Sequence, residues 1–322
     1  MSNKTILVVG GTGSFGSAYV DYLLSSTNYN VRVLSRDEHR QLEMRRKYPA
    51  GPRMTYVLCD IRDRAAVDIA MDGIWGVVHS AALKTVESAT FHFEEVVKTN
   101  IIGTMNVIGA ARDKGVSKFL FIGTDKAVNP KNNYGFSKGT GERLVIDFNQ
   151  KCSSTALRLF AVRGGNVWAS RGSVALLWKK AIANNESIAV TNKDNTRFHV
   201  EMKEWVSFCH RVLENAHGGE VFIPKISSWR LGDLAIAFEA PVDYLKNDRD
   251  EDKMHESLIG EDETCRVVDI GWSYVLEPPK SLRGVWNYES WQGFRPDTGW
   301  TYTSDKAEKL PVEYLRKLVS EL

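Results

Sequence analysis

FLFIGTDKAVNPKNNYGFSK, residues 119–138, joins an apolar run to a polar segment that carries several reactive side chains. The run 119–122 predicts a buried strand, and Pro130 separates that strand from a helical segment containing Tyr134 and Lys138. These two residues are four positions apart, so a helix places them on one face. A buried strand, a loop and a helix in this order form one unit of an α/β fold.

The same alternation of strand and helix extends outward from this stretch through the first half of the chain. Apolar runs predict strands at residues 5–9, 30–34, 54–58, 76–79, 118–122 and 155–160. Helical patterns separate these strands, including a long one at 91–114. Short apolar strands that alternate with helices are typical of a parallel sheet covered on both faces. We therefore predict an α/β fold with a doubly wound parallel sheet of the Rossmann type.

After residue 160 the rhythm changes. A Gly-rich loop at 163–172 is followed by helical patterns at 174–184, 201–216 and 231–239, a short strand at 220–223 and a helical tail from 313. We expect two units. Residues 1–165 form a dinucleotide-binding domain to which 199–226 returns, and 166–198 and 227–322 form a smaller C-terminal substrate domain.

Composition excludes several classes of partner. The 322 residues are 43% hydrophobic and 25% charged, with a formal net charge of +2, so there is no electrostatic reason to expect nucleic acid or a membrane as partner. No run approaches the ~20 apolar residues of a spanning helix, and the N-terminus has no signal-peptide pattern. The four cysteines are scattered without metal-ligand spacing. We expect reduced thiols, no metal site and a cytoplasmic location.

Glycines after the first predicted strand indicate a dinucleotide site. Gly10, Gly13 and Gly16 stand between the strand 5–9 and a helical pattern. A tight turn, close backbone approach to a pyrophosphate and a helix N-terminus that faces it are what such a site needs. A glycine turn without a ligand is the alternative, but the position between strand and helix favours the dinucleotide.

The end of the second strand bears on which dinucleotide binds. Ser35 and Arg36, with Arg40, favour the 2′-phosphate of NADP, whereas Asp37 keeps NAD as the alternative. The two arginines could equally form the solvated start of a helix. Asp60, after the third strand, could reach the adenine or cap the next helix.

Two pairs of residues suggest the chemistry. A lysine ammonium stabilises a nearby tyrosinate, so we expect Lys138 to lower the pKa of Tyr134, which could then take a hydroxyl proton while hydride leaves the same carbon. Thr124 could hydrogen-bond that substrate hydroxyl. The same Tyr–Lys spacing recurs at Tyr302 and Lys306, where we interpret it as structural.

Asp125 and Lys126 directly follow the central strand, where an open α/β sheet binds its ligands. Such a pair alone would be a surface turn, and its position favours a role in catalysis. Burial lowers the pKa of a lysine and a neighbouring carboxylate raises it, so the protonation state of Lys126 stays open at this point.

Together these motifs resemble a known family. GGTGSFG at 10–16 and the helix-borne YGFSK are similar to the extended short-chain dehydrogenase/reductases. The longer run TDKAVNPKNNYGFSK resembles the inverting UDP-N-acetylglucosamine 4,6-dehydratases within that group. Further stretches agree with the resemblance, which covers nearly the whole chain: HSAALKTVESA at 79–89, KTNIIGT at 98–104, RGGNVWASRGSV at 163–174, NTRF at 195–198, GGEVFIPKI at 218–226 and DKMHESLIGEDE at 252–263.

The resemblance implies a stepwise dehydration of UDP-N-acetylglucosamine with a recycled NADP. Tyr134 takes the O4 proton, Asp125 is the acid for O6, and Lys126 is the base at C5 whose reprotonation on the other face inverts that carbon. Retaining dehydratases carry Asp-Glu at the two positions, so Asp125-Lys126 discriminates between them. A retaining dehydratase or a 4-epimerase on the same fold is the alternative, and relatives of this kind form homo-oligomers.

The resemblance also assigns binding residues, each of which has a surface or structural role as its alternative. Cofactor-binding positions beyond those already named are Thr12, Ser14, Phe15, Ile61, Ala81, Ala82 and Lys84. Substrate-binding positions are Lys84, Asn166, Arg171, Arg197 and Arg249, with Arg163 and Lys253 as further cations for the phosphates. Asn100 stands where the fold places a helix asparagine that supports the active site. The chain departs from the family pattern at Gly123, at Gly164 and at Asp250-Glu251, beside Arg249.

Overall fold

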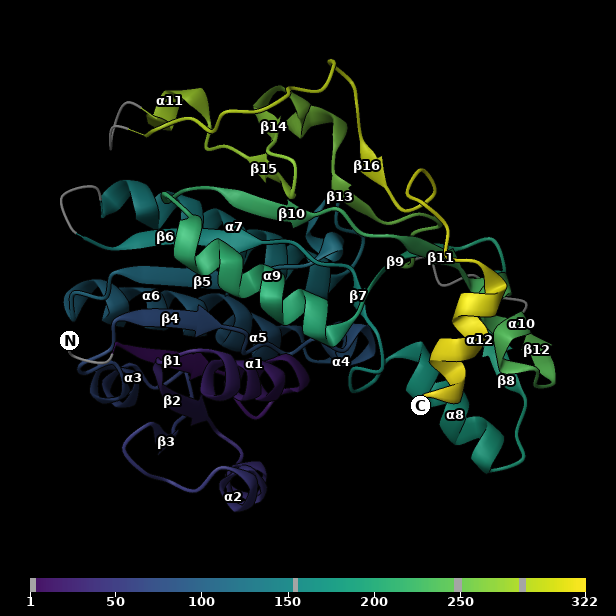
Figure 1. Cartoon of the computed structure of the whole chain (residues 1–322), viewed down its shortest axis with the longest axis horizontal. Helices are drawn as coiled ribbons and strands as arrows, with labels where there is room; N and C mark the ends of the chain where they lie inside the picture. Colours follow the sequence, from purple (N-terminus) through teal and green to yellow (C-terminus); the bar gives the residue numbers. More distant parts are fainter. Residues whose placement is uncertain (1–3, 153–155, 246–250, 284–287) are drawn as a thin grey trace.

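A nine-stranded sheet forms the centre of the computed structural model, which describes residues 4–152, 156–245, 251–283 and 288–322 (Figure 1). Its strands are β1 (Thr5–Val9), β2 (Asn30–Ser35), β3 (Met54–Leu58), β4 (Gly76–His79), β5 (Lys118–Ile122), β6 (Arg158–Val162), β10 (Val221–Pro224), β14 (Val267–Asp269) and β15 (Ser273–Leu276). The order is β14-β15-β10-β6-β5-β4-β1-β2-β3. All pairs from β3 to β10 are parallel, and β15 and β14 add antiparallel strands at one edge. The predicted doubly wound parallel sheet is confirmed, and the strand order reverses between β1 and β4.

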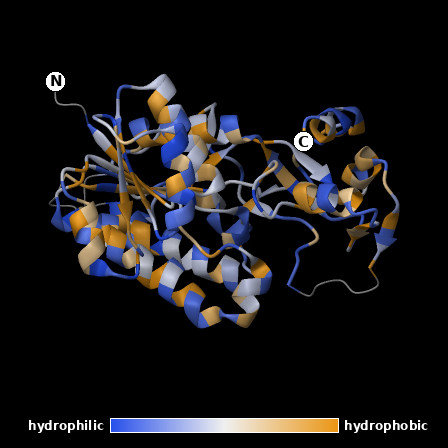
Figure 2. Cartoon of the chain, turned by 90° about the horizontal axis from the view of Figure 1, so that it is seen from below, coloured by the Kyte–Doolittle hydropathy of each residue, from blue (hydrophilic) through white to orange (hydrophobic). Residues whose placement is uncertain are grey.

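Helices cover both faces of the sheet because its strands are apolar on both sides. In β1, Ile6 and Val8 pack in the cluster with α1 (Ser14–Ser26) and α9 (Met202–Asn215), whereas Leu7 and Val9 pack in the cluster with α3 (Arg64–Ala70), α6 (Thr104–Asp113) and α7 (Asn133–Lys151). The α2 helix (Glu38–Lys47) contributes to the first cluster. Figure 2 shows the hydrophobic strands lying between these helical layers.

The helix predicted at 91–114 is wrong as a single element. The chain instead forms α4 (Val86–Phe91), α5 (Phe93–Val96), the π-helix η1 (Val97–Gly103) and then α6. The wider turn of the π-helix carries Asn100, whose side chain is buried. Asn100 accepts a hydrogen bond from the backbone N–H of Leu83 and donates to the Leu83 carbonyl and to Ser137 Oγ on α7, at 2.8, 3.0 and 2.9 Å. The side chain therefore ties the loop after β4 to the helix that bears Tyr134 and Lys138.

A smaller unit has its own core beside the sheet. It contains α8 (Val174–Ala183), β8 (Ile188–Val190), α10 (Leu231–Phe238), β12 (Val242–Tyr244) and α12 (Val312–Ser320) around buried side chains such as Trp178, Trp229 and Leu315. Three strands connect it to the sheet: β7 (Asn166–Val167), β9 (Thr196–Val200) and β11 (Ser228–Arg230). The remaining elements are η2 (Asp125–Ala127), β13 (Ser257–Ile259), η3 (Glu261–Arg266), α11 (Lys280–Arg283) and β16 (Tyr302–Thr303).

The predicted domain boundaries stay a prediction, and the strand order adds one refinement. Residues 227–322 were assigned to the smaller unit, yet β14 and β15 lie within that range and hydrogen-bond onto the large sheet next to β10. Their sequence gave no strand prediction because each is only a few residues long. Over the described ranges, none of the helices combines the length and apolarity that crossing a bilayer requires.

Two histidines buried in this fold make its stability sensitive to acid. Burial, with Lys138 as a second cause, lowers the pKa of His79 to about 3, and burial lowers that of His199 to about 4, both from 6.5. As pH falls below 6.5, these two histidines become protonated in the unfolded chain but stay neutral in the folded chain. The free energy of unfolding should therefore fall by about 1.4 kcal/mol per pH unit for each histidine. Urea denaturation between pH 7 and pH 4.5 measures this slope.

The substitution His79→Leu is expected to reduce that slope. Thr104, the hydrogen-bond partner of His79, keeps its bond to the Asn100 carbonyl. His39→Leu, which changes an exposed imidazole on α2, serves as the control and should leave the slope unchanged. Equal slopes in the parent and both variants would contradict the assignment.

Candidate active site

The glycine-rich loop after β1 fits a dinucleotide. Gly10 has φ of +80°, and a Cβ placed on it would lie 2.8 Å from the backbone nitrogen of Ala81. A Cβ on Gly16 would lie 2.4 Å from the Gly10 carbonyl oxygen, so the first turn of α1 can pack this closely only without a side chain there. The loop thereby keeps backbone N–H groups and a helix N-terminus open toward the topological switch point, as pyrophosphate binding requires.

Other predicted members of this site lie around the loop. Phe15 packs its ring against Tyr19 and Trp205, so it can offer the site only its backbone. Ile61 is buried against Gly103 of the π-helix, where a Cβ would lie 2.7 Å from its side chain. Ala82 follows Ala81 in the loop after β4 and is partly buried. The backbone of Ala81 lies against Gly10, so the loop after β4 borders the glycine-rich loop, and Ile61 lies against the π-helix.

At the carboxyl end of β2, the arginine side chains are more exposed than the carboxylates beside them. Asp37 caps α2 by accepting from the backbone N–H of Arg40 at 3.0 Å, and its other oxygen lies 3.2 Å from Arg40 Nε. Arg36 is half exposed and 3.9 Å from Asp60. Asp60 is held by Arg62, whose hydrogen bonds lower the pKa of the Asp60 carboxyl. Both carboxylates are therefore already engaged within the protein.

Ser35 is fixed by a residue that the sequence did not single out. The side-chain amide of Gln41 donates to the Ser35 carbonyl, to Ser35 Oγ and to the Val57 carbonyl, at 3.0, 3.1 and 2.8 Å. Gln41 thus sets the end of β2 in place beneath the expected ribose. It belongs to a charged helix, and no local pattern distinguishes it from a surface residue.

Arg171 lies at the glycine-rich loop. Its guanidinium donates to the Thr12 carbonyl and to Ser14 Oγ, and its backbone N–H also donates to Ser14 Oγ. Lys84 Nζ donates to the Arg171 carbonyl at 2.7 Å. Burial and the charge of Arg40 lower the pKa of Arg171, while the charges of Asp37 and Glu43 oppose this effect. The sequence assigned Arg171 to the substrate, and the structure positions it where a dinucleotide phosphate is expected.

The turn after β5 brings the reactive groups together. Thr124 donates through its hydroxyl to Asp125 Oδ1 at 2.9 Å, and Lys126 Nζ donates to the same oxygen at 3.1 Å. Asp125 is fully buried, and its backbone N–H is bonded to the Gly164 carbonyl. Helix α7 approaches this turn so closely that a Cβ on Gly135 would lie 2.3 Å from the Lys126 carbonyl oxygen. Gly135, between Tyr134 and Phe136, is therefore a part of the site that the sequence reasoning missed.

The charges around Lys126 decide its protonation state. Burial lowers the pKa of Lys126, but Asp125 and Glu256 together outweigh burial and raise it. The Lys126 ammonium lies 3.1 Å from Asp125 and 3.6 Å from Glu256. Burial raises the pKa of Asp125, and Glu256 adds to this while Lys126 opposes it. Lys126 therefore rests as an ammonium ion, which the sequence could not decide because Glu256 is far away along the chain.

Burial shifts the pKa values of both Tyr134 and Lys138. Burial raises the pKa of Tyr134 to about 12, while Lys126 and a hydrogen bond with Thr124 lower it only in part. Lys138 Nζ lies 3.9 Å from the centre of the Phe121 ring, and burial lowers its pKa to about 7. Lys126 is the lysine whose charge lowers the pKa of Tyr134 in this structure, and the expected effect of Lys138 on the phenol stays a prediction.

Two of the residues expected on the substrate side lie close to Lys126. Asn166 Oδ1 accepts from Lys126 Nζ at 3.4 Å. Arg197 bonds the carbonyls of Lys253 and Met254, and its charge acts on Lys126. Arg249 lies outside the described residues.

Arg163 is a different case from these cations. It is 3% exposed and pairs with both Glu142 and Glu263, so its expected role as a phosphate ligand is wrong. Lys253 is likewise engaged, with Glu256 and with the Val128 carbonyl.

The two glycines that depart from the family pattern are explained by packing. A Cβ on Gly123 would lie 2.4 Å from the Val162 carbonyl oxygen, and one on Gly164 would lie 2.8 Å from the Trp205 ring. The neighbouring strand and helix have closed on these positions. Larger residues there would need the backbone to shift.

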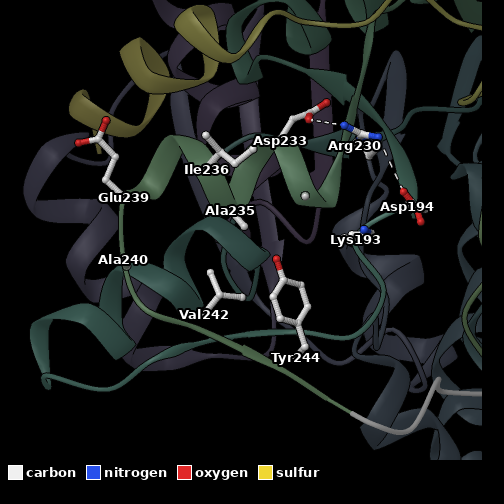
Figure 3. A pocket seen from close by; sticks show the side chains of 11 residues that line it. Lys193, Asp194, Arg230, Asp233, Ala235, Ile236, Glu239, Ala240, Val242 and Tyr244 are labelled. Carbon is white, nitrogen blue, oxygen red and sulfur yellow. Dashed lines mark hydrogen bonds and ion pairs between the residues drawn. The ribbon is translucent and has the colours of Figure 1, made fainter.

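A separate hollow lies in the smaller unit, about 280 Å³ in volume (Figure 3). Its rim includes Arg230, which pairs with Asp233 at 2.8 Å and with Asp194 at 3.7 Å. Arg230, Asp194 and Asp233 are thus engaged with one another, and Lys193 and Tyr244 also line the hollow. Within the described ranges, no group of three or more His, Cys, Asp and Glu side chains is arranged to hold a metal ion.

The chain is similar to several known proteins. The chain matches the family described as polysaccharide biosynthesis protein over residues 6–278. It is 37% identical over 280 residues to a UDP-N-acetylglucosamine 4,6-dehydratase (inverting) of Campylobacter jejuni, covering 86% of this chain and 84% of the relative. A UDP-glucose 4-epimerase of Rickettsia akari is 33% identical over 333 residues, covering 99% and 96%.

Solved structures show the same fold. Pen from Bacillus thuringiensis superposes with a TM-score of 0.90 at 31% identity, covering 99% of this chain and 97% of that one. The dTDP-glucose 4,6-dehydratase DesIV of Streptomyces venezuelae, solved with NAD, has a TM-score of 0.70 at 20% identity over 78% and 86% of the two chains. This second likeness concerns the fold alone.

The placement of Arg171 can be tested by ligand affinity. We expect Arg171→Ala to weaken NADP⁺ binding about tenfold, because hydrogen bonds from a charged donor contribute ~1.5–3 kcal/mol, and to leave the affinity for UDP nearly unchanged. Calorimetric titration with each ligand measures both effects. Arg230→Ala, on the rim of the distant hollow, is the control. A loss of UDP affinity with unchanged NADP⁺ binding would restore the assignment of Arg171 to the substrate.

Proposed function

Because this chain belongs to the polysaccharide biosynthesis protein family, we propose that it catalyses the 4,6-dehydration of UDP-N-acetylglucosamine with inversion at C5. The observation that carries the proposal is the buried pair of Asp125 and Lys126, in direct contact beside Tyr134. An acid and a base held in contact are suited to removing the elements of water from neighbouring carbons.

We propose NADP as the cofactor. Asp37 and Asp60 are engaged by Arg40 and Arg62, which leaves the half-exposed Arg36 as the open charge at the end of β2. A cation in this place suits a 2′-phosphate. Such a cofactor would supply the chemistry of accepting hydride from C4 and returning it to C6. All other steps belong to side chains of this protein.

Tyr134 begins the reaction by taking the proton of O4. Thr124, at the turn after β5, is one of the groups that lower the pKa of the Tyr134 phenol. A pKa of about 12 leaves Tyr134 protonated at neutral pH, so its activation requires a cation closer to the oxygen. Lys138, one helical turn away and resting over Phe121, is the residue of this chain that can turn toward it.

Asp125 and Lys126 carry out the elimination. Transfer of one proton from the Lys126 ammonium to the Asp125 carboxylate produces an amine and a carboxylic acid without a proton from outside. The amine then removes H5 while the acid protonates O6, which leaves as water, and the original ion pair is restored. The Lys126 ammonium next delivers a proton to the opposite face of C5. The proton that Tyr134 took from O4 can recharge Lys126, so the protons balance.

One experiment tests the reaction. Incubation with UDP-N-acetylglucosamine and NADP⁺ in D₂O should give a 4-keto-6-deoxy product that carries deuterium at C5 and the inverted configuration, as read by NMR. The 4-epimerase alternative, which the full-length likeness to the Rickettsia enzymes favours, would give an epimer without loss of water. A retaining dehydratase would give the deoxy product with unchanged C5 configuration. Either of these products would overturn the proposal.

The assignment of the base is tested by substitution. Lys126→Ala should abolish turnover, since it removes the proposed base, while UDP affinity stays within a few-fold of the parent. Lys131→Ala, an exposed lysine in the same loop, is the matched control and should keep full activity. Retention of activity by Lys126→Ala would show that another group removes H5.

A further inference from the structure

Glu256 is a buried carboxylate that the proposed mechanism does not use. It directly precedes β13 and is 3% exposed. Its backbone N–H donates to Ser304 Oγ at 2.9 Å, and its carbonyl accepts from the Ser304 N–H at 2.8 Å. The residue is therefore held firmly in place on a segment more than a hundred positions away from Lys126 in the chain.

The carboxylate lies between two lysines. Its Oε1 is 3.6 Å from Lys126 Nζ, and its Oε2 is 3.4 Å from Lys253 Nζ. Arg197 also acts on it, and the three cations together outweigh burial and lower the pKa of Glu256. Glu256 is thus a permanent negative charge.

A structural role does not require this arrangement. Lys126 already has Asp125 as a partner at 3.1 Å, and Glu256 already has Lys253. Burying a further charge near an existing ion pair is unfavourable unless its geometry brings a specific gain. The distance of 3.6 Å between Glu256 Oε1 and Lys126 Nζ points instead to control of the amine itself.

We propose that Glu256 is a positioning residue for Lys126, holding the amine between two carboxylates so that it faces Asp125 and stays loaded with the proton that the pair will share. The proposal rests on the proposed function, because it names a third member of the same proton-transfer site. Glu256 does not touch the reacting carbons. It acts through Lys126.

The negative charge of Glu256 shifts the pKa values of Asp125 and Lys126 in the same direction. It raises the pKa of Lys126 and also that of Asp125. The elimination needs one shared proton on the pair, a state that exists between the two pKa values. Loss of the negative charge lowers both values, so the pH range in which the pair holds one proton moves to lower pH.

The other charged groups around Lys126 and Glu256 are the same in the parent protein and in a variant altered at Glu256. Arg197 and Tyr134 face Lys126, and Lys253 and Arg197 face Glu256. They remain in place when Glu256 alone is altered. The direction of the shift therefore follows from the removed carboxylate.

The test is Glu256→Gln, which keeps the shape and removes the charge. We expect both limbs of the pH profile of kcat/KM for water loss to move to lower pH by about one unit, the size typical of a charge at this distance. Glu277→Gln is the matched control, since Glu277 is a fully buried carboxylate just after β15 that pairs with Arg283 and Arg295. The control should lower thermal stability and leave both limbs in place. Unmoved limbs in Glu256→Gln would overturn the proposal.

A second readout does not depend on turnover. The titration of Lys126 can be followed by ¹³C NMR after reductive methylation, with its signal identified by its loss in Lys126→Ala. Glu256→Gln should lower the midpoint of that titration, and an unchanged midpoint would overturn the proposal. If the parent protein forms no 4-keto-6-deoxy product but the midpoint shifts, the proposed function fails and the positioning role stands. Should Glu256→Gln not fold, Glu256→Asp, which withdraws the carboxylate by one methylene, should shift the midpoint in the same direction by less.

Discussion

The buried guanidinium of Arg163 is the interaction on which the active site depends. It lies directly after β6 and donates to Glu142 of α7 at 2.6 and 2.8 Å and to Glu263 of η3 at 2.7 Å through each of two nitrogens. Each carboxylate receives two hydrogen bonds, the geometry in which a buried arginine pair is strongest. Removal of one partner from such a group typically costs about 3–5 kcal/mol. The sheet, the helix that carries Tyr134 and the segment that carries Glu256 are thereby fixed to one another.

The turn at residues 124–126 is positioned by the segments that Arg163 holds together. Gly164 follows Arg163 in the chain, and its carbonyl oxygen accepts a hydrogen bond from the backbone N–H of Asp125 at 2.9 Å. On the other side Gly135 lets α7 approach the Lys126 carbonyl without a side chain between them. Asp125 is therefore held by β6 and Lys126 is overlaid by α7, so the two groups meet at 3.1 Å inside the protein. Their mutual protonation then depends on a charge, Glu256, that a third segment supplies.

Local patterns in the sequence were sufficient for much of this arrangement. All five strands from β1 to β5 begin at the predicted residue, because short runs or alternations of apolar residues mark a strand packed against helices. The strand expected at 155–160 instead runs from Arg158 to Val162, since a continuous apolar run does not mark its own ends. The break of the long helix at η1 escaped prediction because a π-helix keeps the same apolar side as an α-helix and differs only in the hydrogen bonds around Asn100.

The sequence by itself predicted the strands β1 to β5 and the glycine loop, and it proposed the reactive residues, because each of these is written in neighbouring positions. Only the tertiary structure decided which charges surround those residues and hence their protonation states. Lys126 is an ammonium because Asp125 and Glu256 both lie within 4 Å of it, and Arg171 faces Thr12 rather than the sugar side because the chain folds back over the loop. Charge interactions act through space and fall off with distance, so partners remote in the chain become decisive only when the fold brings them together.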